Sequence, residues 1–177
     1  TYPDSNYPII LPIGTVFSAT NENSESFTFV NNDIITIGAT GGSGGGPGST
    51  AEVYEGSLRS TSFVYDGNSD SQKFIIPSSK IDNSHLTVKL QTSVSNSTGF
   101  YSSWDLSSNY AGLTSGSEVY FLQEVEDGWY EIYFGDGIVG KKPSHGNVIT
   151  VNYIETKGPQ GNNIGKYDVR KGRRSFS

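Results

Sequence analysis

The stretch from Val119 to Ile154 constrains the fold of this chain more than any other, because it contains a clear hairpin signal. Two alternating runs, Val119–Glu126 and Trp129–Phe134, flank the pair Asp127-Gly128. An Asp-Gly pair between alternating runs predicts a two-residue type I′ turn, because that turn needs positive φ at both central positions. We therefore predict a β-hairpin centred on this pair.

A two-residue turn also sets the register, so it predicts that Val125 faces Tyr130 and that every second residue outward shares their face. The predicted core face carries six side chains: Phe121, Gln123, Val125, Tyr130, Ile132 and Phe134. The opposite face carries five residues that form a candidate interaction surface: Leu122, Glu124, Trp129, Glu131 and Tyr133. In this register Glu124 lies directly opposite Glu131, and Leu122 lies opposite Tyr133.

Further turn signals follow the predicted hairpin. Gly135–Gly137 predicts a second turn, Pro143–Asn147 a third, and Val148–Ile154 a last strand. The whole stretch is then expected to form a three-stranded meander.

The composition indicates an all-β fold. The chain has 22 glycines and 12% aromatic residues, a combination typical of short strands joined by tight turns. His85–Gln91 alternates strictly, which predicts that Leu86, Val88 and Leu90 point inward. The sequence contains no amphipathic helix longer than about two turns. We expect an antiparallel β-sandwich-like domain with long loops.

Shifts in composition divide the chain into three segments. Residues 1–50 form an extended and strand-forming segment with the glycine-rich run Thr40–Thr50, residues 51–157 form the main antiparallel β domain, and residues 158–177 form a C-terminal linker or tail. The glycine-rich run lacks the Gly-Lys-Ser/Thr ending of a phosphate-binding loop, so we expect a surface loop. Because the chain begins at Thr1 and contains no methionine, we expect it to be processed or to be a fragment of a longer protein.

Charge and residue usage argue against several functional classes. The net charge of −6 argues against nucleic acid or an anionic membrane as a partner. No apolar run approaches the roughly 20 residues needed to span a bilayer, and a chain with 0 cysteines has no disulfide or zinc–thiolate site. Asp66, Asn68 and Asp70 match the opening of an EF-hand loop, but Ser71 and Pro77 break the pattern. We expect no cofactor, no metal and no small-molecule substrate.

Glu124 and Glu131 are the strongest catalytic candidates, because paired carboxylates can hydrolyse glycosidic bonds. Neighbouring residues on a flat hairpin face do not form the cleft that such a pair needs, and like charges directly opposite are destabilising. His85 and His145 have neither a helical i, i+4 mate nor a cysteine for metal binding. We predict a protein that is not an enzyme.

Apolar side chains on both faces of the predicted hairpin indicate a second layer, which either this chain or a partner protein supplies. Aromatic residues together with Ser-, Thr- and Asn-rich loops leave an alternative open, namely a carbohydrate-binding or adhesin β-sandwich module. That alternative requires solvent-facing aromatic side chains that stack on sugar rings, with Trp104 and Trp129 as candidates.

An ordered series of residues resembles the signature of a known family. The series consists of the following residues: Phe134-Gly135-Asp136-Gly137, Gly140, Pro143, Gly146, Ile149, Tyr153, Gly158 and Gly161-Asn162. It is similar to the pattern of the baseplate J-like family, which contains the baseplate wedge proteins of contractile-tailed bacteriophages. Pro12–Phe17, Glu55-Gly56, Gln72–Phe74 and Asp82–Val88 also resemble strands of that family, so the likeness covers most of residues 9–163.

The resemblance implies a structural subunit of a phage tail baseplate wedge, which joins other copies of itself and other baseplate proteins. It implies a location in the virion tail baseplate after assembly in the host cytoplasm, and it supplies no catalytic residue. The residues expected to form structural turns are Asp127, Gly128, Phe134, Gly135, Asp136, Gly137, Gly140, Pro143 and Gly146. Among them, the resemblance assigns Asp136 to capping its turn by accepting backbone N–H bonds.

Overall fold

The computed structural model describes residues 9–21, 24–37, 51–69, 72–92 and 101–157. The regular elements of the described chain are strands and one single-turn 3₁₀ segment, η1 (Glu126–Gly128), which confirms the all-β prediction. No helix in the described part of the chain has the length and apolarity needed to cross a membrane. The glycine-rich run Thr40–Thr50 and the segment 158–177 lie outside the described residues.

The chain forms two compact units. The first comprises the described residues up to Leu58 together with Thr156 and Lys157, and the second comprises Arg59–Glu155. The first unit contains two small antiparallel sheets, whose strands are β1 (Ile9–Leu11) with β4 (Ile35–Ile37), and β2 (Val16–Thr20) with β3 (Ser26–Val30) and β5 (Tyr54–Glu55). The small core of this unit consists of Ala19, Phe27 and Phe29.

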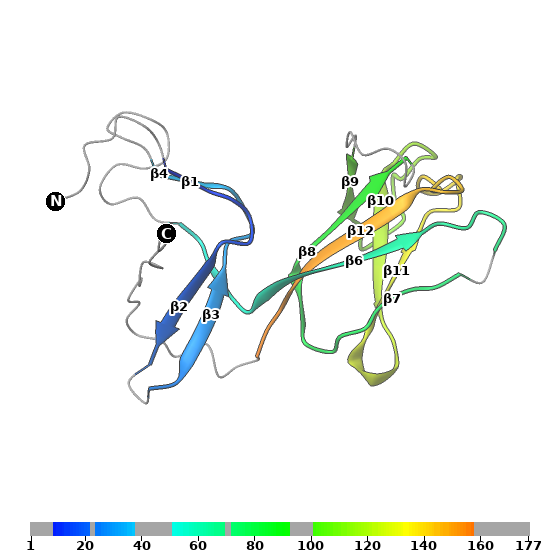
Figure 1. Cartoon of the computed structure of the whole chain (residues 1–177). Coiled ribbons are helices and arrows are strands. Elements are labelled where there is room, and N and C mark those ends of the chain that lie inside the picture. Colours follow the sequence, from blue (N-terminus) through cyan, green and yellow to red (C-terminus); the bar gives the residue numbers. More distant parts are fainter. Residues whose placement is uncertain (1–8, 22–23, 38–50, 70–71, 93–100, 158–177) are drawn as a thin grey trace. The chain divides into compact units, whose positions relative to one another are not determined.

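The second unit is built on one seven-stranded sheet in the order β6-β12-β8-β9-β10-β11-β7 (Figure 1). Its strands are β6 (Ser57–Val64), β7 (Phe74–Ile76), β8 (Ile81–Gln91), β9 (Tyr101–Leu106), β10 (Val119–Glu124), β11 (Tyr130–Phe134) and β12 (Val148–Glu155). β9 and β10 run parallel, whereas β12 with β8, β8 with β9, β10 with β11, and β11 with β7 run antiparallel. The sheet bends so strongly that it nearly closes on itself.

The main core fills the inside of this bent sheet. Ile132, Ile149 and Val151 are fully buried, and along β12 Ile149 and Val151 alternate with half-buried residues. The inward positions predicted for β8 are confirmed, because Leu86, Val88 and Leu90 are all buried in this core. Packing on one shared interior therefore replaces the two facing sheets of a sandwich.

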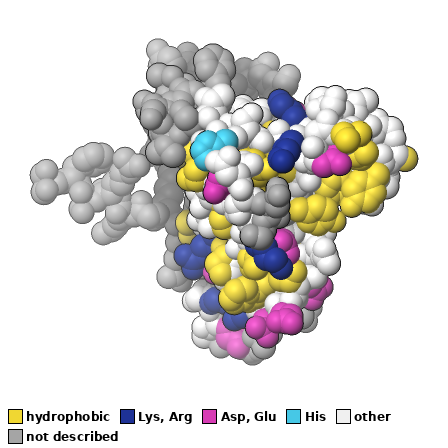
Figure 2. All heavy atoms as spheres, turned by 90° about the vertical axis from the view of Figure 1, so that its right-hand side faces the viewer, with side chains coloured by type: hydrophobic (Ala, Val, Ile, Leu, Met, Phe, Trp, Pro, Cys, Tyr) yellow, Lys and Arg dark blue, Asp and Glu magenta, His cyan; other side chains and the backbone are white. Residues whose placement is uncertain are grey.

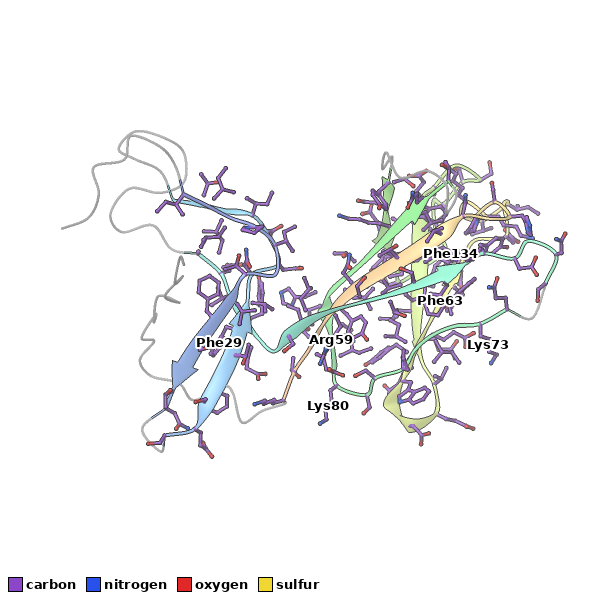
Figure 3. All side chains as sticks on the ribbon, in the orientation of Figure 1. Phe29, Arg59, Phe63, Lys73, Lys80 and Phe134 are labelled. Atoms are coloured by element: carbon purple, nitrogen blue, oxygen red, sulfur yellow. The ribbon has the colours of Figure 1, made fainter. Side chains whose placement is uncertain are left out.

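The open seam of the sheet lies between its end strands, β6 and β7. The Gln72 side chain crosses this seam: its Nε2 donates to the Val64 carbonyl at 2.7 Å, and its Oε1 accepts from the Asp66 backbone N–H at 2.7 Å. Phe63 on β6, which Figure 3 labels, contacts Phe74 on β7 across the seam, with ring centroids 5.6 Å apart. One amide side chain and the aromatic contacts of Phe74 with Phe63 and Tyr65 thus take the place of a strand ladder.

The predicted turn residues form a turn, but the predicted register is wrong by one residue. Asp127 and Gly128 both have positive φ, 63° and 70°, and Trp129 N–H donates to the Glu126 carbonyl at 3.3 Å, as a type I′ turn requires. The Val125 N–H, however, donates to the Trp129 carbonyl at 2.8 Å, so Trp129 bonds to both Val125 and Glu126. Two residues therefore oppose one, which is a β-bulge.

This bulge moves the side chains of β10 to the other face. Glu124 pairs with Tyr130, Leu122 with Ile132 and Phe121 with Tyr133, in place of the predicted partners. The core face of the hairpin consists of Tyr120, Leu122, Tyr130, Ile132 and Phe134. The β11 half of the prediction is correct, and the β10 half is inverted because a one-residue shift reverses every side chain.

The predicted meander is also wrong. β12 does not pair with β11, because β11 already has β10 on one edge and β7 on the other. Instead, β12 crosses to the other half of the sheet and lies between β6 and β8 (Figure 1). The stretch Gly135–Asn147 is therefore a crossing connection, which we call the crossing loop.

Candidate functional site

The crossing loop begins with a close approach between two glycines. Gly135 and Gly140 are both buried, and their backbones pack directly against each other. A Cβ added to Gly135 would lie 2.3 Å from the Gly140 carbonyl carbon, which no side chain tolerates. Gly140 also has φ of +83°, a conformation that favours glycine. The first turn of the loop therefore depends on both glycines.

Asp136 caps this turn with its carboxylate. Its Oδ1 accepts the backbone N–H groups of Ile138 and Val139, each at 2.8 Å. The bond from Val139, and to a smaller extent the bond from Ile138, lowers the pKa of the Asp136 carboxyl below its ordinary value. Gly137 N–H donates to the Gly140 carbonyl at 3.1 Å and completes the turn. The turn holds Ile138 in solvent, where 76% of it is exposed.

The same turn is attached to the loop that precedes β10. Gly140 N–H donates to the Thr114 carbonyl at 3.1 Å, and Lys141 N–H donates to the Ser117 carbonyl at 2.8 Å. The Lys141 ammonium bonds to the Glu118 carboxylate and lies 6.0 Å from the centre of the Trp104 ring. The turn is consequently fixed to the body of the second unit on more than one side.

The second half of the crossing loop reaches the end of β6. Pro143 is buried, and Ser144 and Asn147 close a turn in which Asn147 N–H donates to the Ser144 carbonyl at 3.0 Å. Gly146, with φ of +83°, donates its N–H to the Tyr65 carbonyl at 2.8 Å. Tyr65 N–H in turn donates to the Asn147 carbonyl at 2.8 Å. These contacts deliver β12 to its place beside β6.

The five residues of the candidate interaction surface do not share one face. Trp129, Glu131 and Tyr133 alternate along β11 on its outer face, and Trp129 is 38% exposed. Leu122 packs against the core on the other face, and Glu124 shares its side of β10 because the two are two residues apart. Glu124 and Glu131 therefore do not form the opposed carboxylate pair that the predicted register implies.

An aromatic group covers the outer face beside Tyr133. Phe121 stacks on Tyr133 with ring centroids 5.2 Å apart, and Tyr110 lies over Phe121 at 4.7 Å. A side-chain hydrogen bond with Tyr110, which stabilises the neutral phenol of Tyr133, is the main cause that raises the pKa of Tyr133. Glu131 lies 3.8 Å from the Lys73 ammonium. The correct register would have identified Phe121, whereas nothing local in the sequence identifies Tyr110 as its cover.

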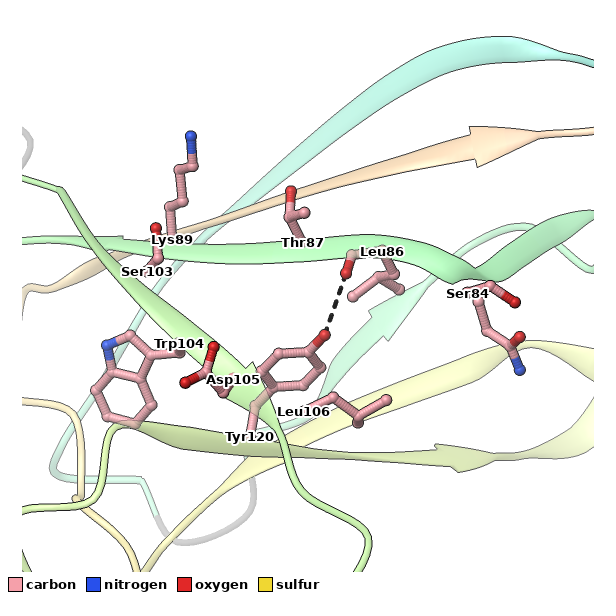
Figure 4. A pocket seen from close by; sticks show the side chains of 10 residues that line it. Ser84, Leu86, Thr87, Lys89, Ser103, Trp104, Asp105, Leu106 and Tyr120 are labelled. Carbon is pink, nitrogen blue, oxygen red and sulfur yellow. Dashed lines mark hydrogen bonds between the residues drawn. The ribbon is translucent and has the colours of Figure 1, made fainter. Parts of the chain in front are cut away.

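A hollow opens where β8 separates from β9. β9 pairs with β8 only from Val88 to Gln91 and then turns to pair with the start of β10. The hollow has a volume of about 310 Å³, and Tyr120 spans it by donating its hydroxyl to the Leu86 carbonyl at 3.2 Å (Figure 4). Burial, with a smaller effect from Asp105, raises the pKa of Tyr120 to about 12. The sequence gives no signal for this hollow, because it depends on how three distant segments pair.

No three His, Asp or Glu side chains among the described residues lie close enough together to hold a metal ion. The face shown in Figure 2 carries hydrophobic groups separated by basic and acidic side chains. This arrangement of rigid turns, exposed apolar side chains and mixed charge is suited to contact with other proteins.

The described residues form an all-β domain whose exposed turns and aromatic side chains are suited to contact with other proteins. Residues 57–165 match the family described as the third domain of bacteriophage baseplate wedge protein gp6. This match covers more than half of the chain, so the chain belongs to that family. None of the curated proteins compared with the chain matches it.

Membership of this family gives the chain its general role. It is a structural subunit of the baseplate wedge of a phage tail, it is located in the virion tail baseplate, and it interacts with other baseplate proteins. The matched residues contain the crossing loop, the β10–β11 hairpin and the hollow.

Proposed function

We propose that the second unit is a non-catalytic connector that joins copies of the chain to each other and to neighbouring baseplate proteins. The observation that carries this proposal is the family match, since it spans the whole sheet of the second unit up to residue 155 and beyond. Rigid contact surfaces support it, because a preformed turn loses little conformational entropy on binding. The ordered series around Phe134–Gly137 supports the finer assignment to the baseplate J-like group.

The partners in this proposal are proteins, with assembly in the host cytoplasm before the tail is complete. A net charge of −6 favours protein partners over nucleic acid or an anionic membrane. The separation of Glu124 and Glu131 onto different faces supports a role without catalysis, because a hydrolytic pair would have to face one substrate.

We place one contact on the outer face of β11, around Trp129, Glu131 and Tyr133. Trp and Tyr are the residue types most enriched in the energetic centres of interfaces. Here they stand beside Glu131 and Lys73, a charged pair 3.8 Å apart that can serve as a polar rim. The face thus has the apolar centre and polar edge that a protein partner requires.

The test is co-purification and light scattering of the full chain with the other baseplate proteins of the same tail. We expect a complex with at least one of them, and we expect Trp129→Ala to weaken it about tenfold, as loss of an aromatic anchor does. Tyr101→Ala is the matched control, because Tyr101 is an exposed aromatic residue (53%) on β9. An unchanged affinity in Trp129→Ala would remove this face from the interface, and a chain that binds none of the proteins would overturn the connector role.

A further inference from the structure

The first turn of the crossing loop presents an apolar tip, which consists of Ile138 and Val139. Ile138 is 76% exposed and Val139 is 36% exposed. A single exposed aliphatic residue is common on protein surfaces, but these two adjacent residues are held by the Asp136 carboxylate, which accepts both of their backbone N–H groups. The tip is therefore a pre-organised projection whose burial requires little ordering of the chain.

The hollow between β8 and β9 has the complementary form. Apolar groups line its depth, with side chains from Leu86, Trp104, Leu106 and Tyr120 (Figure 4). Its volume of about 310 Å³ is at the lower end of the range for ligand sites, which suits one branched aliphatic side chain better than a large ligand. Leu106 remains 53% exposed at its edge, so an inserted side chain would cover apolar surface that water now contacts.

The charges around the tip and around the hollow are also complementary. Lys89 and Asp105 line the hollow, one of each sign. Beside the tip lie Asp136 and Lys142, and the Lys142 Cβ is 3.7 Å from the position that a Cβ on Gly137 would occupy. A cation and an anion on each side allow two opposite-charge pairings to form around one inserted side chain, which favours a single orientation.

We propose that the apolar tip of one copy of this chain inserts into the hollow of a second copy. Ile138 enters the space bounded by Leu106 and Tyr120, with Lys142 near Asp105 of the other copy and Asp136 near its Lys89. This inference rests on the proposed self-association and specifies the two surfaces that make it. One inserted side chain buries little area, so the contact is weak alone and gains strength from other contacts in the assembled baseplate.

Cysteine crosslinking tests this contact directly, because the chain contains 0 cysteines. The full chain with Val139→Cys, which leaves the inserting Ile138 in place, is mixed under mild oxidation with the full chain carrying Ser103→Cys, a conservative change at an exposed position lining the hollow. The control mixture replaces Ser103→Cys with Ser60→Cys, an exposed serine on β6. We expect about tenfold more crosslinked heterodimer with Ser103→Cys, because docking raises the effective thiol concentration. Equal yields in the two mixtures would overturn the proposal.

A second pair of variants separates docking from random collision. Leu106→Asp, added to the Ser103→Cys chain, should abolish the excess because it places a charge in the apolar hollow. Val64→Asp is the matched control, since Val64 is 51% exposed and Leu106 is 53% exposed. Retention of the excess in Leu106→Asp would also overturn the proposal. If the crosslinking excess is absent while neighbouring baseplate proteins still co-purify with the chain, the tip contact alone is rejected. If no neighbouring baseplate protein co-purifies, the connector role is rejected.

Discussion

The second unit contains two turns built on the same dipeptide, and the aspartate has a different role in each. The hairpin turn has Asp127-Gly128, and the first turn of the crossing loop has Asp136-Gly137. In the hairpin turn the aspartate itself adopts positive φ, 63°. In the crossing loop, Asp136 instead uses its carboxylate to bind two backbone N–H groups, and the glycines take the positive φ values.

The difference shows that a turn dipeptide determines local geometry but not where the chain goes next. The hairpin turn contains no buried residue. A Cβ added to Gly128 would lie 3.5 Å from the Ser79 Cβ, which is an ordinary van der Waals contact. The crossing turn is packed so tightly that a Cβ on Gly135 would meet backbone at 2.3 Å. We therefore expect the crossing turn to be intolerant of change and the hairpin turn to be tolerant.

Gly135→Ala should have the largest effect. The added methyl group can fit only if the Gly140 backbone moves. Such overpacking lowers the free energy of unfolding by about 3 kcal/mol. The displaced turn would also lose the bonds that attach Gly140 and Lys141 to Thr114 and Ser117. Urea unfolding monitored by tryptophan fluorescence should show a large decrease in the transition midpoint.

Gly116→Ala is the control for that variant. Gly116 is exposed in the neighbouring loop, and the atom nearest to a methyl group added there would be the Thr114 Oγ1 at 3.9 Å. We expect its free energy of unfolding to stay within about 0.5 kcal/mol of the wild type. Similar losses in the two variants would show that the Gly135–Gly140 approach has no special role.

Asp136→Ala should have a smaller effect, which depends on pH. The folded state lowers the pKa of this carboxyl, so its contribution to stability is present above the unfolded pKa and is lost as pH falls through the folded pKa. The melting temperatures of wild type and Asp136→Ala should therefore differ at neutral pH and converge as the pH falls through the folded-state pKa of Asp136. Asp136→Asn, which keeps an acceptor oxygen without the charge, should lose less at neutral pH. A difference that is constant over the whole pH range would show that the ionised carboxylate does not stabilise the turn.

Local patterns predicted the secondary structure of the second unit well. Composition indicated the all-β class, and the alternation in His85–Gln91 identified the inward positions of β8, because period-2 burial is a local property of a strand. Asp127-Gly128 identified the turn, because positive φ is also a local requirement. Each of these features depends on residues that are neighbours in the sequence.

Features that depend on distant residues were not predictable in this way. The bulge at Val125 and Glu126 leaves the alternating pattern intact, so the sequence cannot distinguish the two registers. The crossing of β12 follows from the occupation of both edges of β11, and the hollow follows from the divergence of β9 from β8. The prediction that five residues share one face was therefore wrong for Leu122 and Glu124, which lie on the other face of the hairpin.

Deletion of Val125 should have the smallest effect and would sharpen the contrast between the turns. Without this residue the type I′ turn from Glu126 to Trp129 can close a regular two-residue hairpin in which Glu124 still pairs with Tyr130. We expect the free energy of unfolding to change by less than about 1 kcal/mol. Deletion of Glu131 is the control, because β11 has no extra residue to lose, so the deletion shifts its register and turns Ile132 away from the core. If the two deletions were equally destabilising in urea unfolding, the bulge would be required for the fold, and the hairpin turn would be as constrained as the crossing turn.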